Sequence, residues 1–110
     1  RDRFDYDPKG VARHFQVPGR AALLARVRER LADLETFDVA AVEAACRGLA
    51  DELGIKAAEI IHPMRLALTG RTMGPGLFEI AATLGKEATL ARLDRAVQYI
   101  AEITQHGVDE

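Results

Sequence analysis

The chain has 110 residues, of which 48% are hydrophobic and 29% charged, and its formal net charge at pH 7 is −2. This length is enough for one domain with a hydrophobic core and too short for a core plus a separate catalytic unit. The slight negative charge argues against a general polyanion binder, and no apolar run approaches the roughly 18 residues that a membrane span requires.

The first helix is predicted in the basic third of the chain, where residues 1–30 include eight basic and four acidic residues. The chain opens on Arg1-Asp2-Arg3, without an initiator methionine or a secretory leader, so we expect a segment cut from a longer protein. Asp7-Pro8 combines an N-cap with a proline at the first helical position and starts a short helix that runs to Phe15. Residues 1–17 are therefore predicted to form a lead-in segment.

A second helix follows Pro18-Gly19. Its apolar stripe has helical spacing and consists of Leu23, Leu24, Val27, Leu31 and Leu34. Its other side is basic and carries Arg20, Arg26, Arg28 and Arg30. We interpret these arginines as a solvated helix face in preference to a phosphate track, because arginine is common on helix surfaces.

Two further helices are predicted between Asp38 and Gly70. Asp38 is a natural N-cap for a third helix, which Gly54 ends and whose core positions are Val42, Cys46, Leu49 and Leu53. A fourth helix runs from Lys56 to Thr69 and ends at Gly70. Pro63 lacks an amide proton and clashes with the carbonyl four residues earlier, so we expect a kink or a restart there.

The last helices follow a glycine-rich loop, residues 70–76. A fifth helix runs from Leu77 to Leu84 and ends at Gly85, and a final helix runs from Lys86 to about Thr104. Residues 105–110 should fray, which leaves 18–104 as the helical domain. No segment alternates with period two, so we expect an all-α fold: a compact array of about five to six helices with crossed axes and no sheet.

Neither a catalytic centre nor a metal site is indicated. The sequence contains no serine nucleophile, and His14, His62 and His106 lack partners at the short spacings that metal sites use. The glycine-rich loop follows a helix rather than a strand and lacks the lysine that ends a P-loop. Cys46, the single cysteine, is interpreted as a core residue rather than a reactive thiol. A chain with one cysteine cannot form an internal disulfide, which fits a reducing compartment, with the cytoplasm as the default.

The loop is expected to be a displayed surface. Glycine and proline set its shape by backbone restriction rather than by burial. Just before the loop, His62, Arg65 and Thr69 share one helix face, while the apolar residues of this helix take the opposite face. The polar face should therefore point outward beside the loop.

The central stretch also resembles a known family. The run His62-Pro-Met-Arg-Leu-Ala-Leu-Thr-Gly-Arg-Thr72, then Gly74-Pro-Gly-Leu-Phe-Glu-Ile80, then Leu84-Gly-Lys-Glu87, is similar to the carboxy-terminal anticodon-binding region of bacterial glutamyl-tRNA synthetases. Tyr6-Asp7-Pro8-Lys9 and Glu52-Leu-Gly-Ile-Lys56 extend the resemblance, which covers almost the whole chain.

This resemblance implies a class I ligase that joins L-glutamate to its tRNA through an adenylate, with ATP and Mg²⁺ held by a catalytic domain that these 110 residues do not contain. The chain itself should hold no cofactor and should bind rather than catalyse. Its implied partners are the anticodon loop of tRNA(Glu) and its own catalytic domain, with no membrane.

The resemblance also implies the binding residues. Arg65, Gly74, Pro75, Gly76 and Leu77 match positions at which relatives read anticodon bases, and Arg71 is a possible phosphate contact. Some relatives place a hydroxyl residue where this chain has Gly74, so a side-chain hydrogen bond is lost at that position.

The same residues also have purely structural interpretations. Arg65 could pair with Glu59 or with an acid of the third helix, and Pro63 and Pro75 could only set the direction of the chain. For Phe78 we prefer a core position, and for Leu77 the pattern alone favours neither.

Two other functions fit the sequence less well. A helical DNA- or protein-interaction module would need a basic recognition helix, and the fourth helix offers only Arg65. A structural appendage, whose loop contacts its own catalytic domain, would have no affinity for tRNA.

Overall fold

The computed structural model describes the backbone of residues 5–109 and the side chains of residues 5–104. Throughout this part of the chain the regular structure is helical and no strand occurs, which confirms the all-α prediction. The elements are α1 (Pro8–Gly10), the π-helical segment η1 (Val11–Phe15), α2 (Arg20–Ala32), α3 (Val39–Leu53), α4 (Ala58–Thr69), α5 (Leu77–Leu84) and α6 (Lys86–Asp109).

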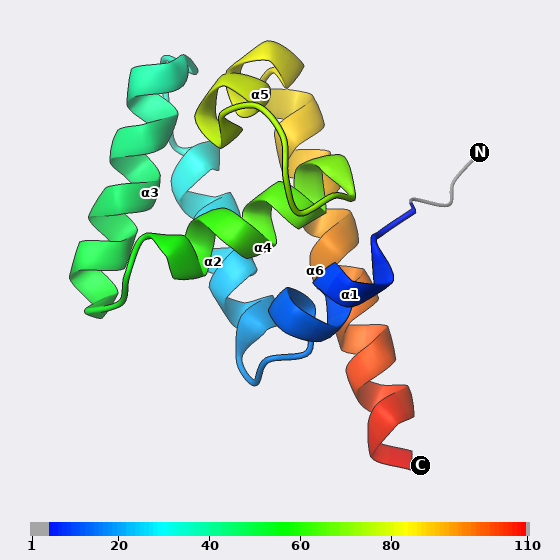
Figure 1. The fold of residues 1–110 in the computed structure, drawn as a ribbon. Coiled ribbons are helices and arrows are strands. Elements are labelled where there is room, and N and C mark those ends of the chain that lie inside the picture. The colour runs from blue at the N-terminus through cyan, green and yellow to red at the C-terminus, as the bar shows by residue number, and fades with distance from the viewer. Residues whose placement is uncertain (1–4, 110) are drawn as a thin grey trace.

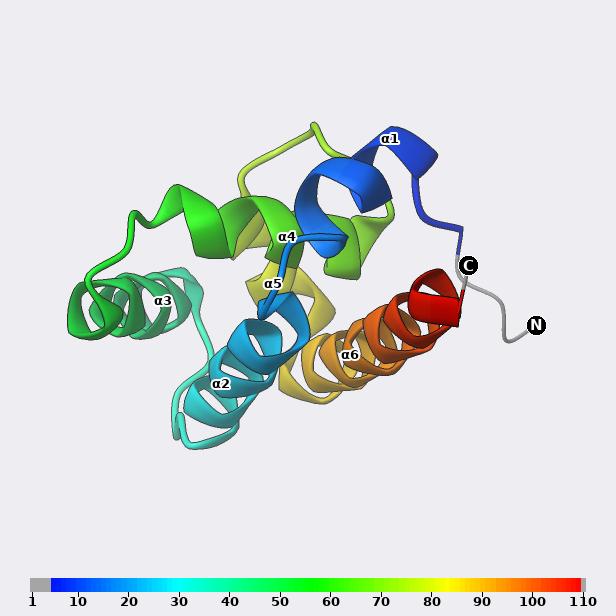
Figure 2. The same ribbon diagram turned by 90° about the horizontal axis from the view of Figure 1, so that it is seen from below.

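The helices cross one another around one core, as expected (Figure 1). Seen from below, α1, η1 and the loop before α5 lie on one side of α4, while α2 and α6 lie on its other side (Figure 2). The fully buried large side chains come from η1 and from every helix from α2 to α6 except α5, and include Phe15, Leu24, Leu31, Leu49, Ile60, Met64 and Leu93. The central helix α4 therefore has one side against the core and one side facing α1, η1 and the loop.

The segment predicted as a lead-in belongs to this core. Phe15 has no exposed surface, and its ring packs edge-on against Tyr6, with ring centroids 5.2 Å apart. The amide of Asp7 donates to the carbonyl of Gly70 at 2.8 Å, so the segment is also bonded to the end of α4. Residues 6–15 thus form part of the domain's packing rather than an approach to it.

The last helix extends beyond the expected end near Thr104. Its backbone is helical to Asp109, through Gly107. A glycine inside a helix costs about 1 kcal/mol relative to alanine but does not forbid the helix. Secondary structure therefore does not mark the boundary that we expected after residue 104.

Within the described residues, no helix combines the length and the hydropathy needed to cross a bilayer.

The arginines of α2 join helices together. Arg28 makes two hydrogen bonds to the Asp94 carboxylate of α6, at 2.9 and 3.3 Å. Arg30 pairs with Glu52 near the end of α3, and this contact holds the pKa of Glu52 below its usual range. The pairing also accounts for an acidic residue at the negative end of a helix dipole. Arg28 and Arg30 thus bind carboxylates of neighbouring helices, which does not support the alternative interpretation of these arginines as a phosphate track.

Cys46 is a core residue, as predicted. It is 2% exposed, its sulfur lies 3.8 Å from that of Met64, and burial raises the pKa of the thiol to about 12. A thiol with so high a pKa contributes almost no thiolate at neutral pH, and thiolate is the reactive form.

Helix α4 runs through Pro63 without a restart. Because Pro63 has no N–H, the Glu59 carbonyl loses its partner within the helix. The guanidinium of Arg20, from the start of α2, donates to this carbonyl at 2.9 Å. Arg20 thereby replaces the missing helical bond and attaches α4 to α2.

This replacement predicts a coupling between Arg20 and Pro63. Arg20→Ala should lower the free energy of unfolding by about 0.5 to 1.5 kcal/mol, the usual contribution of one hydrogen bond. In a Pro63→Ala background the loss should be smaller, because the restored N–H can bond the Glu59 carbonyl itself. A double-mutant cycle of urea unfolding measures the difference, and equal losses in the two backgrounds would contradict this role of Arg20.

Candidate functional site

The glycine-rich loop connects α4 to α5 and arches over the outer side of α4 (Figures 1 and 2). It starts at Gly70, a left-handed residue with a φ of 79° whose amide donates to the Leu66 carbonyl. The first part of the loop rests on the N-terminal segment: a Cβ added to Gly10 would lie only 2.7 Å from Cγ2 of Thr72. Glycine at position 10 therefore lets the loop approach α1 closely.

Arg65 holds the far part of the loop. Its Nη1 donates to the carbonyl of Pro75 at 2.5 Å. The alternative pairing with Glu59 or with an acid of α3 does not occur among the described residues. Arg65 is half-buried, so one edge of its guanidinium braces the loop while the group remains accessible beside it.

Thr69 and Arg71 shape the start of the loop. The Thr69 hydroxyl donates to the Arg65 carbonyl at 2.8 Å and accepts from the Arg71 amide at 3.0 Å. The guanidinium of Arg71 donates to the carbonyls of Asp5 and Gly70, at 3.1 and 3.0 Å. Arg71 is exposed, so it combines a structural contact with a charge at the surface.

The loop residues Gly74, Pro75 and Gly76 are all exposed, as expected for a displayed surface. Gly74 has a φ of 147°, which strains any other residue. Gly76 is the N-cap of α5 and has no side chain to accept from the first turn. The free amides of that turn can therefore bind an acceptor from a ligand.

The side chain of Leu77 does not belong to this displayed surface. It is 3% exposed and packs in the core, so the base contact predicted for it is wrong for its side chain. Leu77 is the first residue of α5, and the apolar face of that helix packs inward. Phe78 is half-buried against the core, as we preferred, and the Arg47 guanidinium lies 5.8 Å from the centre of its ring.

Met73 is a surface residue that sequence reasoning missed. It is 84% exposed, more than the other large hydrophobic residue found exposed, Val39, at 38%. A methionine inside a glycine- and proline-rich loop has no helical stripe to join, and this was the available signal. Its thioether gives the loop an adaptable apolar contact.

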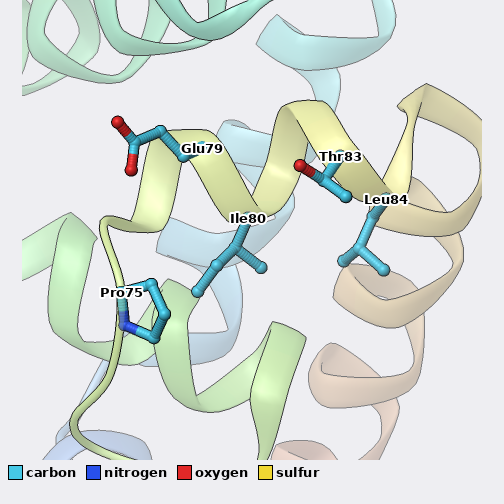
Figure 3. Close-up of a pocket in the computed structure, with 5 residues that line it drawn as sticks. All are labelled: Pro75, Glu79, Ile80, Thr83 and Leu84. Carbon is cyan, nitrogen blue, oxygen red and sulfur yellow. The ribbon is translucent and has the colours of Figure 1, made fainter.

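Beside the loop lies an open, mainly apolar hollow of about 300 Å³ (Figure 3). It is lined by Pro75, Glu79, Ile80, Thr83 and Leu84. In the close-up, Pro75 stands on the loop and the other four side chains come from α5. The hollow thus offers an apolar wall with one carboxylate at its edge. No group of residues able to hold a metal ion occurs in the part of the chain that the structure describes.

The chain is similar in sequence to known proteins. Residues 1–97 match the family described as anticodon binding domain. The chain is 54% identical over 101 residues to a glutamate–tRNA ligase of Moorella thermoacetica, covering 92% of the chain and 21% of that protein. For the glutamate–tRNA ligase of Desulforudis audaxviator the identity is 52% over 102 residues, covering 91% of the chain and 20% of that protein.

The fold also has a solved counterpart. A crystal structure of a glutamate tRNA ligase from Elizabethkingia meningosepticum, in complex with its amino acid, superposes with a TM-score of 0.84 at 24% identity. The match covers 91% of this chain and 20% of that one. The chain thus spans about a fifth of the length of the relatives it matches.

Proposed function

Because the chain belongs to the anticodon-binding domain family, we propose that it binds the anticodon loop of tRNA(Glu) as one domain of a glutamate–tRNA ligase. In this proposal the ligase joins L-glutamate to its tRNA in the cytoplasm, and a class I catalytic domain outside these residues holds ATP and Mg²⁺. The identity to two ligases over nine-tenths of the chain supports this assignment. The chain contributes binding and positioning of the tRNA.

The displayed loop is the observation that carries the proposal. Anticodon bases are splayed out of the stack, so a protein reads them by stacking and by hydrogen bonds to their edges. Pro75 offers an apolar surface, and the backbone of Gly74 and Gly76 is open to close approach. The Arg65 guanidinium lies beside the Pro75 carbonyl, where its planar face can stack on a base.

Three neighbouring features extend this surface. The hollow between Pro75 and α5 offers a base an apolar wall, and Met73 at the loop can contact a second base. Arg71 supplies a phosphate contact at the start of the loop, while its Nη1 donates to the carbonyls of Asp5 and Gly70. The contribution of Leu77 is its amide at the start of α5 rather than its side chain.

A helical DNA- or protein-interaction module is less well supported. The family match favours the anticodon-binding domain, and two further arginines near α4 donate to carbonyls: Arg20 to that of Glu59, and Arg92 to that of Leu68. A basic recognition helix for a DNA groove is therefore not formed by α4.

The proposed function predicts discrimination between anticodons. A labelled RNA stem-loop with the tRNA(Glu) anticodon should bind the chain more tightly than the same stem-loop with one anticodon base changed. One wrong base costs about 1 to 3 kcal/mol, so the dissociation constants should differ about 5- to 150-fold. Fluorescence anisotropy at fixed salt measures both constants, and equal affinities, or no binding of either RNA, would overturn the proposal.

A further inference from the structure

A cluster of cationic and titratable side chains lies on the outer side of α4, apart from the loop. The imidazole rings of His14, from η1, and His62, from α4, stack with centroids 5.3 Å apart and an interplanar angle of 22°. Arg13 is exposed next to His14, and Arg20 bonds the neighbouring Glu59 carbonyl. Three elements of the fold thus bring two imidazoles and two guanidiniums together.

The charges in this cluster do not cancel. Burial lowers the pKa of His14, and the neighbouring groups His62, Arg13 and Arg20 lower it further. Glu59, the acidic group of this neighbourhood, acts on Arg20. The neutral form of His14 is therefore favoured in the free protein, and an anion placed over the two rings would favour protonation of His14.

The cluster is close to the proposed anticodon surface. His62 precedes Arg65 by three residues, about 4.5 Å along the helix axis, and both residues lie on the same face of α4. The loop and η1 stand on this same side of the helix (Figure 2). An RNA strand whose bases reach Arg65 and Pro75 would therefore carry its backbone past the histidines.

Building on the proposed function, we propose that Arg13, His14 and His62 form a site for a backbone phosphate of the bound RNA, with Arg20 fixing α4 beneath it. Both imidazoles can donate to phosphate oxygens once protonated. The site reads no base, so it strengthens binding of cognate and changed anticodons alike. Because the phosphate favours protonated imidazole, the RNA is bound more tightly as the pH falls through the range in which His14 titrates.

The test measures stem-loop affinity between pH 5.5 and pH 8 at fixed salt, for the unaltered chain and for the His14→Gln/His62→Gln double variant. The unaltered chain should gain affinity at low pH, and the double variant should lose about tenfold at pH 5.5 and less than about twofold at pH 8. Arg13→Gln, at an exposed position, should weaken binding and reduce the slope of affinity against salt by about one phosphate contact. Arg26→Gln removes one charge from the exposed side of α2 and should change neither.

An independent readout is the His14 pKa itself, which NMR titration should find raised when RNA is bound. If the double variant keeps the affinity and pH dependence of the unaltered chain while anticodon discrimination persists, the phosphate site is wrong and the proposed function stands. If the pH-dependent binding is found without discrimination between anticodons, the phosphate site stands and the proposed function fails.

Discussion

Phe15→Ala should lower the free energy of unfolding by about 3 to 5 kcal/mol, the range for deleting a large buried aromatic side chain. Phe15 has no exposed surface and meets the rings of Tyr6 and Tyr99, with centroids 5.2 and 6.2 Å away. Removing the ring leaves a cavity between η1 and α6 that the neighbouring rings cannot close. Total stabilities of about 5 to 15 kcal/mol are usual for domains, so this loss is a large fraction.

Phe37 supplies a matched control for this change. It is half-buried in the connection between α2 and α3, so Phe37→Ala removes the same atoms at a site already open to water and should cost clearly less. Urea unfolding followed by circular dichroism measures both variants. If Phe15→Ala lowers the free energy of unfolding no more than Phe37→Ala does, residues 6–15 are not part of the core. The lead-in segment predicted from the sequence would then be right.

The positions of the helices could be predicted from local chemistry. Three of the four core positions predicted for the third helix are buried; the fourth, Leu53, is only partly buried, and the buried Ala50 was not predicted. The N-cap Asp38 accepts from the Ala41 amide, as predicted. The stop signals also hold, because Gly54 and Gly70 adopt left-handed conformations at the ends of α3 and α4. Such signals act within one or two turns, so the sequence carries them directly.

The contacts that build the candidate site could not be predicted in this way. Arg65 meets the Pro75 carbonyl only because the loop folds back over α4, and Arg20 meets the Glu59 carbonyl only because α2 crosses α4. The burial of Leu77 depends likewise on how α5 is turned towards the core. The resemblance to a known family identified the loop residues, but only the fold shows which of their side chains are buried and which are exposed.

Arg65→Ala should weaken binding of the tRNA(Glu) stem-loop by about 1 to 3 kcal/mol, the loss expected for an arginine that contacts a base. Two effects contribute: a cationic planar group leaves the surface, and the Pro75 carbonyl loses the donor that holds the loop. Arg65→Lys keeps the charge and one donor but loses the planar face, so it should recover only part of the affinity. The free energy of unfolding should fall by about 0.5 to 1.5 kcal/mol, the usual contribution of the one hydrogen bond that is lost.

Binding to RNAs with changed anticodons separates the two roles of Arg65. If the guanidinium contacts a base, the Arg65→Ala penalty should shrink when that base is replaced, because the contact is then lost in both proteins. If Arg65 acts only through the loop, the penalty should be the same for every anticodon position, since a displaced Pro75 disturbs the whole surface. An unchanged affinity for all RNAs, with the fold intact, would remove Arg65 from the site and leave the hydrogen bond to Pro75 as a purely structural contact.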